Sequence, residues 1–313
     1  MSKTSWHIII NPHAGSGKTM SEWAGAQTRL DSLGVNYTAV LTNHKAHATL
    51  LAREAAEQGH RRILAVGGDG TIHEVFNGVL SWCAETGTDP SEFVLGVAPI
   101  GSGNDWIKTL GVPHDVKAVV DLLAAESFGV QDVVRVTAAG GKVCYMTNIG
   151  GIGFDSHVCE RVNRQKESGK RSKLIYLYGL IHTVLHIKAI NVQVIADGQE
   201  VFKGPCYSIA LGNGLYSGGG MCQVPRAKID DGLLEAAIIP QVGLLSIIKE
   251  APRLYNHTLD KSSKVISVTC RNLDIIPLDA ASRDIFELDG EVEGRAPISI
   301  TVTGQKIGVL RKL

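Results

Sequence analysis

The sequence is poor in the features that mark several large protein classes. Its six cysteines include no C-x-x-C pair, which argues against a zinc site and against a redox dithiol. Lys plus Arg and Asp plus Glu both number 31, so no overall field draws the chain to nucleic acid, and we expect no nucleic-acid partner. Aromatic residues make up only 5% of the chain, while 44% is hydrophobic, a composition typical of a globular protein.

Long apolar runs are also absent. No extended apolar core precedes Asn11-Pro12, so we expect a first strand in place of a signal peptide, and a cytoplasmic chain. The longest lipid-like run, 174–187, is shorter than the roughly 20 residues that cross a bilayer. The preceding residues 161–173 hold six cations against one anion. Segment 161–187 therefore suits transient peripheral contact with an anionic membrane surface, although a solvated loop before a core-facing helix fits equally well.

Strands and helices alternate over the first part of the chain. Such alternation builds a doubly wound parallel α/β sheet with ligands at the carboxyl ends of the strands. From Asp132 onward the pattern changes to strands, interrupted by helical insertions at 156–188 and 243–258. We therefore expect an α/β nucleotide-binding domain at 1–131, completed by the tail 303–313, and a β-rich domain at 132–302. The expected strands are 6–10, 35–42, 62–66, 94–99, 132–138, 143–149, 191–196, 206–213, 233–239, 264–271, 275–277 and 298–302, and the expected first-domain helices include 19–33, 46–58 and 71–80.

The loop Gly67-Gly68-Asp69-Gly70-Thr71 connects an expected strand to an expected helix. Glycines let backbone N–H groups approach phosphate oxygens, and a helix N-terminus favours an anion. Thr71 and Glu74 have the spacing of a capping box, which would fix the loop from its helical side. Asp69 is placed to hold a Mg²⁺ ion that contacts the phosphates. The loop predicts a nucleotide-phosphate site, and the alternative is a tight turn with a capping Asp.

Two more glycine-rich loops follow expected strands of the same sheet. One is Gly101-Ser102-Gly103-Asn104-Asp105, and the other runs from Asn11 to Lys18. Gly17-Lys18-Thr19 resembles the end of a Walker A motif, but Pro12 stands where its first glycine belongs, so a P-loop NTPase is excluded. Lys18 is left open between a phosphate contact and a solvated lysine. Three such loops on one sheet favour a binding site.

Carboxylates recur beside glycines in the β-rich part. Asp230-Asp231-Gly232, downstream of Gly218–Gly220, fits a cation site or a hairpin turn, and the chemistry alone favours the turn. Leu288-Asp289-Gly290-Glu291 sets two carboxylates two residues apart. If Gly290 marks a turn, both side chains can point into a cleft; the alternative is an exposed Asp-Gly hairpin.

Together these motifs resemble the diacylglycerol kinase catalytic-domain family, in the family's order and over nearly the whole chain. Within the family the chain looks most like soluble bacterial lipid kinases, which are related to sphingosine kinases and more distantly to NAD kinases. The resemblance implies an N-terminal α/β domain like that of NAD kinase, a C-terminal β-sandwich domain, and Mg²⁺-dependent transfer of the γ-phosphate of ATP to a primary hydroxyl of diacylglycerol or a related lipid. The motifs are Asn11-Pro12-x-Ala14-Gly15, Gly67–Thr71, Gly101-x-Gly103-Asn104-Asp105, Gly218–Met221 with Pro225 and Asp231–Leu233, and Leu288–Glu291.

The resemblance also implies roles for single residues. Glu291, with Asp289 beside it, matches the general base, and Asp69, Asp105 and Asp289 match an aspartate network around Mg²⁺. Lys228, Asp231 and Leu233 match a separate structural metal site, the first and last through their carbonyls, and this match replaces the turn-only interpretation of Asp231. The positions that match ATP contacts of the family are Thr42, Gly67, Gly68, Asp69, Gly70, Thr71, Ile72, His73 and Ser102. Asn11 and Lys18 of the first loop are further candidates for nucleotide contact, and Lys18 stays open as above.

The chain departs from the family pattern near the third loop. Ser102 replaces a usual threonine, Trp106 a common phenylalanine and Lys108 a frequent arginine, so the hydroxyl, the ring and the charge are kept. The lipid is left open between diacylglycerol, a related glycerolipid and a sphingoid or ceramide lipid. The rival functions are a NAD kinase, which shares the Gly-Gly-Asp-Gly-Thr loop, and a catalytically silent lipid-binding regulator. The oligomeric state is left open, with a homodimer among the alternatives.

Overall fold

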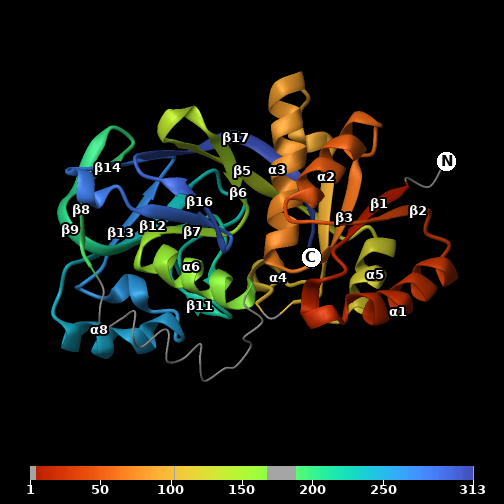
Figure 1. The fold of residues 1–313 in the computed structure, drawn as a ribbon, viewed down its shortest axis with the longest axis horizontal. Coiled ribbons are helices and arrows are strands. Elements are labelled where there is room, and N and C mark those ends of the chain that lie inside the picture. Colours follow the sequence, from red (N-terminus) through yellow and green to blue (C-terminus); the bar gives the residue numbers. More distant parts are fainter. Residues whose placement is uncertain (1–4, 102, 168–187, 313) are drawn as a thin grey trace. The chain divides into compact units, whose positions relative to one another are not determined.

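The computed structural model describes residues 5–101, 103–167 and 188–312. Contacts divide the chain into two compact units, whose elements are labelled in Figure 1. Unit 1 comprises Met1–Val133, Gly218–Gly220 and Thr303–Leu313, and unit 2 comprises Val134–Ser217 and Met221–Val302. Strands β5 (Phe128–Ala138) and β17 (Ile298–Leu310) contribute residues to both units.

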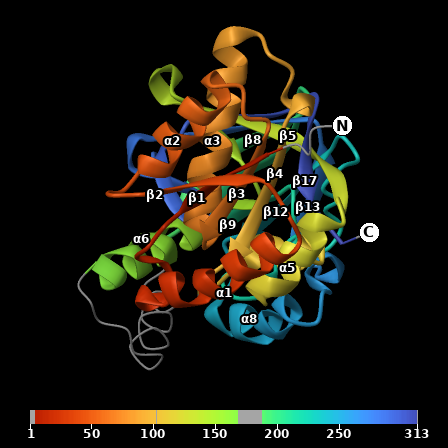
Figure 2. The ribbon, with the colours of Figure 1, turned by 90° about the vertical axis from the view of Figure 1, so that its right-hand side faces the viewer.

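A parallel sheet forms the centre of unit 1. Its strand order is β2-β1-β3-β4-β17, and each neighbouring pair is parallel. Helices α2 and α3 cover one face, and α1 and α5 cover the other (Figure 2). The predicted α/β fold with a parallel sheet is confirmed. The elements are β1 Trp6–Ile10, η1 Ala14–Gly17, α1 Thr19–Ser32, β2 Tyr37–Leu41, α2 His47–Glu57, β3 Arg62–Gly67, α3 Asp69–Thr86, η2 Pro90–Glu92, β4 Val94–Pro99, α4 Asp105–Leu110 and α5 Val116–Ala124.

Burial on both faces explains the apolar sequences of the inner strands. Every residue of β1 is buried, and in β3 and β4 only the first residue is partly exposed. The edge strand β2 has no fully buried residue. Because the strands are parallel, their carboxyl ends and the loops that follow them share one edge of the sheet.

Antiparallel pairs dominate unit 2. Strand β9 pairs with β7, β8 and β12, while β15 pairs with β7 and β16. Further antiparallel pairs are β5 with β6, β8 with β14, β10 with β11, β12 with β13, and β14 with β17. The predicted β-rich second part is confirmed. Its elements are η3 Ala139–Gly141, β6 Val143–Met146, β7 Ile149–Gly153, α6 Phe154–Glu167, β8 Ile190–Ala196, β9 Gln199–Gly212, β10 Tyr216–Ser217, β11 Met221–Cys222, β12 Leu234–Pro240, α8 Leu244–Glu250, η4 Ala251–Leu254, η5 Leu259–Lys261, β13 Ile266–Cys270, β14 Asn272–Pro277, η6 Ala280–Ser282, β15 Ile285–Leu288 and β16 Glu291–Arg295.

Several strand bounds in unit 2 differ from the predictions. The predicted strand 143–149 is interrupted, because β6 ends at Met146 and β7 begins at Ile149. Strands β15 and β16 were not predicted, and they form a hairpin through Asp289-Gly290. Inward side chains such as Phe286 and Leu288 join the main hydrophobic core of the unit. Over the described part of the chain, no helix has both the length and the apolar character required to cross a membrane.

Candidate active site

Three glycine-rich loops of unit 1 are tied to one another at the carboxyl edge of its sheet. The backbone N–H of Asn11 donates to Val66 O at 2.9 Å, and its side-chain Nδ2 donates to Thr71 Oγ1 at 3.2 Å. The N–H of Ile100 donates to Gly67 O at 2.8 Å. The loop after β3 is therefore bonded on one side to the loop after β1 and on the other to the loop after β4.

Close approach explains two of the glycines in these loops. A Cβ atom built on Gly67 would lie 2.4 Å from Thr71 Oγ1, well inside contact distance. A Cβ atom built on Gly103 would lie 3.0 Å from Asp69 Oδ2 and 3.7 Å from Asp105 Oδ2. Side chains at these positions would displace the Thr71 hydroxyl and crowd the Asp69 carboxylate, so the glycines keep the loop edge compact.

Asp69 is the first residue of α3, and its carboxylate joins two loops. Oδ1 accepts hydrogen bonds from the backbone N–H groups of Asp105 at 3.0 Å and Trp106 at 3.4 Å. These N–H groups belong to the first turn of α4 and therefore have no acceptor within that helix. Asp69 thus fixes the start of α4 while it remains at the edge where phosphates are expected.

The predicted capping box at Thr71 and Glu74 is wrong. Helix α3 begins two residues earlier, at Asp69, with Gly68 as its N-cap and no side-chain cap. The carboxylate of Glu74 instead accepts from the backbone N–H groups of Ala46 at 3.0 Å and Ala48 at 3.1 Å. Glu74 therefore links α3 to the start of α2, a pairing across 26 to 28 residues that local spacing does not reveal.

The Asp105 carboxylate also binds a further glycine-rich segment, Gly218–Gly220, which is distant in the sequence. The residue is only 6% exposed. Oδ1 accepts from Lys108 Nζ at 2.6 Å, and Oδ2 accepts from the N–H of Gly219 at 2.7 Å. This bond explains why Gly218–Gly220 belongs to unit 1 although the residues on either side belong to unit 2. The i,i+3 spacing of Asp105 and Lys108 is visible in the sequence, whereas the contact with Gly219 is not.

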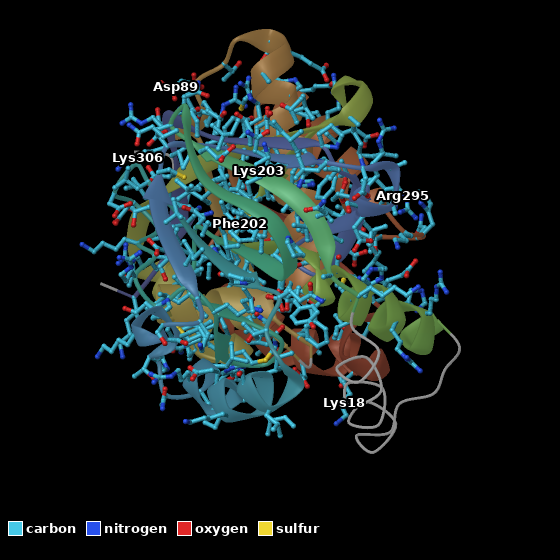
Figure 3. All side chains as sticks on the ribbon, turned by 90° about the vertical axis from the view of Figure 1, so that its left-hand side faces the viewer. Lys18, Asp89, Phe202, Lys203, Arg295 and Lys306 are labelled. Carbon is cyan, nitrogen blue, oxygen red and sulfur yellow. The ribbon has the colours of Figure 1, made fainter. Side chains whose placement is uncertain are left out.

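The other predicted ATP-contacting residues differ in accessibility. Thr42 is buried, and its N–H donates to Ile10 O at 2.8 Å. Ile72 and His73 are buried within α3, and the Ile72 N–H donates to Gly68 O at 3.2 Å. Lys18 is exposed before α1 (Figure 3). Ser102 lies outside the described residues. The roles of these residues remain predictions.

In unit 2, Asp289 is a buried member of an Asp-Gly turn. Asp289 and Gly290 have φ values of 54° and 87°, as the turn requires, and Asp289 is 9% exposed. Its Oδ2 accepts from the N–H of Thr147 at 2.8 Å, and its Oδ1 accepts from the N–H of Asn148 at 2.7 Å. The carboxylate thus fastens the connection between β6 and β7, and the alternative of an exposed hairpin does not apply to Asp289.

The neighbouring peptide of Gly290 is held from two sides. Its N–H donates to Glu287 Oε2 at 2.8 Å, and its carbonyl accepts from Asn163 Nδ2 at 2.9 Å and from the Cys159 thiol at 2.9 Å. Asn163 and Cys159 belong to α6. This helix therefore fixes the turn that precedes Glu291, which is partly exposed at the start of β16. No local pattern in the sequence indicates these contacts.

Asp155, a partly exposed residue near the start of α6, has a carboxyl group that accepts two side-chain hydrogen bonds. Asp155 Oδ2 accepts from Ser208 Oγ at 2.5 Å, and Oδ1 accepts from Gln223 Nε2 at 2.9 Å. Burial raises the pKa of Asp155, although the hydrogen bonds from Ser208 and Gln223 act in the opposite direction. A Cβ atom built on Gly151 would lie 3.4 Å from Glu287 Oε1 and 3.5 Å from Asp155 Oδ2, so both carboxyls border this glycine.

The residues of the predicted structural metal site lie on the surface of unit 2. Lys228, Asp231 and Leu233 are all exposed. Asp231 Oδ1 accepts from the N–H of Leu233 at 3.1 Å, which forms a local turn. Within the described ranges, no group of three or more His, Cys, Asp and Glu side chains is arranged to hold a metal. The predicted site, with one carboxylate and two carbonyls, is not of that kind and remains a prediction.

The predicted membrane-contacting segment 161–187 is described only in its first part. Helix α6 extends to Glu167, and Arg164 forms an exposed ion pair with Glu160 at 2.8 Å. Residues 168–187 lie outside the described residues. The proposed contact therefore remains a prediction.

A parallel sheet with three linked glycine-rich loops is the arrangement of a nucleotide-binding α/β unit, and here the chain continues into a β-rich unit. Comparison with known proteins agrees with this class. Residues 5–136 match the diacylglycerol kinase catalytic domain. Residues 149–311 match the YegS C-terminal NAD kinase beta sandwich-like domain.

Curated relatives and a solved structure extend over most of the chain. A diacylglycerol kinase of Staphylococcus aureus strain bovine RF122 is 28% identical over 292 residues, covering 93% of this chain and 87% of the relative. The putative lipid kinase YtlR of Bacillus subtilis strain 168 is 26% identical over 308 residues, covering 94% and 96%. The crystal structure of a putative diacylglycerol kinase from Bacillus anthracis strain Sterne shares the fold, with a TM-score of 0.76, 24% identity, and coverage of 100% of this chain and 97% of that one.

The chain therefore belongs to the diacylglycerol kinase family, in the group that carries the YegS-type C-terminal domain. This membership confirms the predicted family and the predicted class of enzyme, a lipid kinase. It does not select a lipid.

Proposed function

We propose that this chain is an ATP- and Mg²⁺-dependent kinase that phosphorylates a primary hydroxyl of diacylglycerol or a related lipid. The observation that carries the proposal is the set of three glycine-rich loops, in which the loop after β3 is hydrogen-bonded to the other two, with Asp69 and Asp105 at their edge. Glycine-rich loops at the carboxyl ends of parallel strands suit a nucleotide phosphate chain. The relatives named diacylglycerol kinase and putative lipid kinase favour a lipid as the acceptor.

The residues present fit a magnesium nucleotide. Mg²⁺ prefers one or two carboxylates together with substrate phosphate oxygens, and Asp69 and Asp105 supply two carboxylates near Gly103. When bound, the ion would neutralise charge on the transferring phosphoryl group. The backbone N–H groups of the loop 67–71 would position the phosphates, and Thr42 would contact the nucleotide.

For the proton of the lipid hydroxyl, we assign Glu291 as the acceptor. Both carboxylate oxygens of Asp289 already accept backbone hydrogen bonds, from Thr147 and Asn148. A carboxylate so engaged is better suited to hold the hairpin than to approach a hydroxyl. Asp289 then positions the turn from which Glu291 acts, and the contacts from α6 to Gly290 support the same turn.

The decisive experiment supplies the purified chain with labelled ATP and Mg²⁺ in the presence of a total lipid extract, and identifies the product by mass. A phosphorylated glycerolipid is the expected product, and a phosphorylated sphingoid or ceramide lipid would change the acceptor but keep the class. NAD is tested in parallel, because its phosphorylation without any lipid product would establish the rival NAD kinase. Nucleotide or lipid binding without turnover of any acceptor would favour the silent regulator.

The role of Glu291 has its own test. Glu291→Gln keeps the size of the side chain but removes the carboxylate, so we expect kcat to fall by about 100-fold or more while nucleotide affinity stays near that of the unmodified chain. If the Glu291→Gln variant is folded and as fast as the unmodified chain, the assignment is refuted.

Contact with an anionic membrane through 161–187 is part of the same proposal, because the substrate is a lipid. Six cations against one anion in 161–173 support it. Sedimentation with vesicles containing anionic lipid would measure the contact, and charge reversal at Arg164, Lys170 and Arg171 should weaken it. Binding that is unaffected by this reversal would remove the segment from the proposal.

A further inference from the structure

Asn104 occupies a special position between two of the glycine-rich loops. It has a left-handed φ of 49° and is only 4% exposed. A Cβ atom built on Gly101 would lie 2.9 Å from Asn104 Oδ1, and one built on Gly68 would lie 3.6 Å from it. The side-chain amide therefore points into the space between the loops that follow β3 and β4.

The orientation of this amide is set by a hydrogen bond. Asn104 Nδ2 donates to Gly101 O at 3.1 Å. An amide turned the other way would place Oδ1 against the Gly101 carbonyl, and two acceptors would then face each other. Oδ1 is thus the atom that faces Gly68, and no donor from the described part of the chain bonds to it.

A buried acceptor without a donor indicates a missing partner, because burial of an unpaired polar atom is unfavourable. A phosphate oxygen cannot be this partner, since it is itself an acceptor. The partner must be a cation or a group that carries an O–H or N–H. The chemistry nearby favours a cation, because the next glycine, Gly103, is flanked by the Asp69 and Asp105 carboxylates, and carboxylate and amide oxygens are the ligands that Mg²⁺ takes from proteins.

We propose that Asn104 is a further magnesium-binding residue of the nucleotide site, whose Oδ1 contacts the cation of the magnesium nucleotide directly or through a water that the cation carries. This inference rests on the proposed function and adds a residue to it. Asn104 supplies a neutral oxygen beside two charged ones. Its amide also ties the metal to the loop after β4, so that binding of the cation and order of this loop depend on each other.

Calorimetric titration of ADP in Mg²⁺ and in EDTA tests the proposal without turnover. Asn104→Gly suits the left-handed φ and removes the amide oxygen. We expect the gain in ADP affinity that Mg²⁺ gives the unmodified chain to shrink by about tenfold in this variant, the usual scale for losing a group that supports a metal. Affinity in EDTA should stay the same, because the loop N–H groups that bind phosphate are untouched.

Asn104→Asp is the second variant: it keeps an oxygen facing Gly68 but replaces the donor to Gly101 O by a second acceptor. Its added charge should weaken ADP binding in EDTA and enlarge the gain from Mg²⁺, the opposite of the glycine variant. A purely structural role would change affinity equally with and without Mg²⁺ in both variants, and that result would overturn the inference while leaving the proposed function intact. If the unmodified chain bound no ADP in either condition, the proposed function and this inference would both fail.

Discussion

Replacement of Asp289 by Asn should destabilise unit 2 independently of any effect on catalysis. The side chain is buried, and its two oxygens accept from the backbone N–H groups of Thr147 and Asn148 at 2.8 and 2.7 Å. Both of these residues are themselves buried. Asparagine tolerates the φ of 54° and keeps the shape of the side chain, so the change affects only the hydrogen bonds and the charge.

The magnitude follows from the number of donors left without an acceptor. An Asn side chain has one oxygen, so one of the two N–H groups keeps its partner while the other faces an NH₂ group. Leaving one buried donor unsatisfied costs about 1 to 3 kcal/mol. We therefore expect the free energy of unfolding of unit 2 to fall by about 2 kcal/mol, within the range of that single lost bond.

Asp197 offers a matched control. It also begins an Asp-Gly turn, with φ values of 46° and 82° at Asp197 and Gly198, and its carboxylate accepts from the N–H groups of Arg271 and Asn272. These residues are exposed, so water can replace the lost acceptor. Asp197→Asn should therefore cost less than about 0.5 kcal/mol, the usual range for an exposed position.

The assay must report on unit 2. All four tryptophans, at 6, 23, 82 and 106, lie in unit 1, so tryptophan fluorescence follows the wrong part of the chain. Hydrogen exchange of the amides at 147 and 148, together with urea unfolding followed by circular dichroism, reports the change directly. Exchange at these amides should accelerate about tenfold or more, since about 1.4 kcal/mol is a factor of ten. Equal exchange and equal stability in Asp289→Asn and the unmodified chain would refute the reasoning.

Two further predictions concern pH and backbone space. Burial, and then the nearby His60, lower the pKa of His7 below its ordinary 6.5, so the unfolded chain binds more protons than the folded chain. Stability should therefore be lost as the pH falls from 6.5 through the folded pKa. His7→Gln should flatten this pH dependence, measured by urea unfolding followed by tryptophan fluorescence. Gly153→Ala should lower the free energy of unfolding by about 3 kcal/mol or more, because its Cβ would lie 2.5 Å from Tyr207 O. Gly198→Ala, with a similar φ and open space around the new Cβ, should cost only about 1 kcal/mol. Urea unfolding followed by circular dichroism measures both variants, and equal losses would contradict the steric argument.

Much of unit 1 could be predicted because its signals are local. Strand β4 has the predicted bounds, Val94–Pro99, since a buried apolar run ends at a glycine-rich loop. Helix α3 is longer than the predicted 71–80. It begins at Asp69, and it continues past residue 80 because Trp82 and Cys83 are still buried in the core. Gly87, with a left-handed φ, then ends the helix. Because parallel strands have their carboxyl ends at one edge of the sheet, the parallel arrangement alone predicted that the three loops share that edge.

Contacts between distant residues limited the prediction of the site. The bond from Gly219 to Asp105 joins residues 114 positions apart, and those from Thr147 and Asn148 to Asp289 join residues 142 and 141 apart. A motif identifies the residue type that chemistry needs, but the fold determines which backbone N–H groups reach it. Asn104 was part of a predicted motif, but the motif assigned it no role of its own. Its proposed role rests on two features of the structure: the residue is buried, and no donor in the described ranges bonds to its Oδ1.

The three aspartates predicted around Mg²⁺ share one structural property. Asp69, Asp105 and Asp289 each accept hydrogen bonds from backbone N–H groups of another segment. A carboxylate offers about four lone-pair positions, so a bonded aspartate can still reach a cation. An alanine variant at any of the three would remove a loop contact together with the predicted metal contact, and its loss of activity would not distinguish them. Asparagine variants, compared for stability and for Mg²⁺-dependent nucleotide affinity together, separate the two roles, because the structural bond survives in part while the charge that would attract the predicted metal is lost.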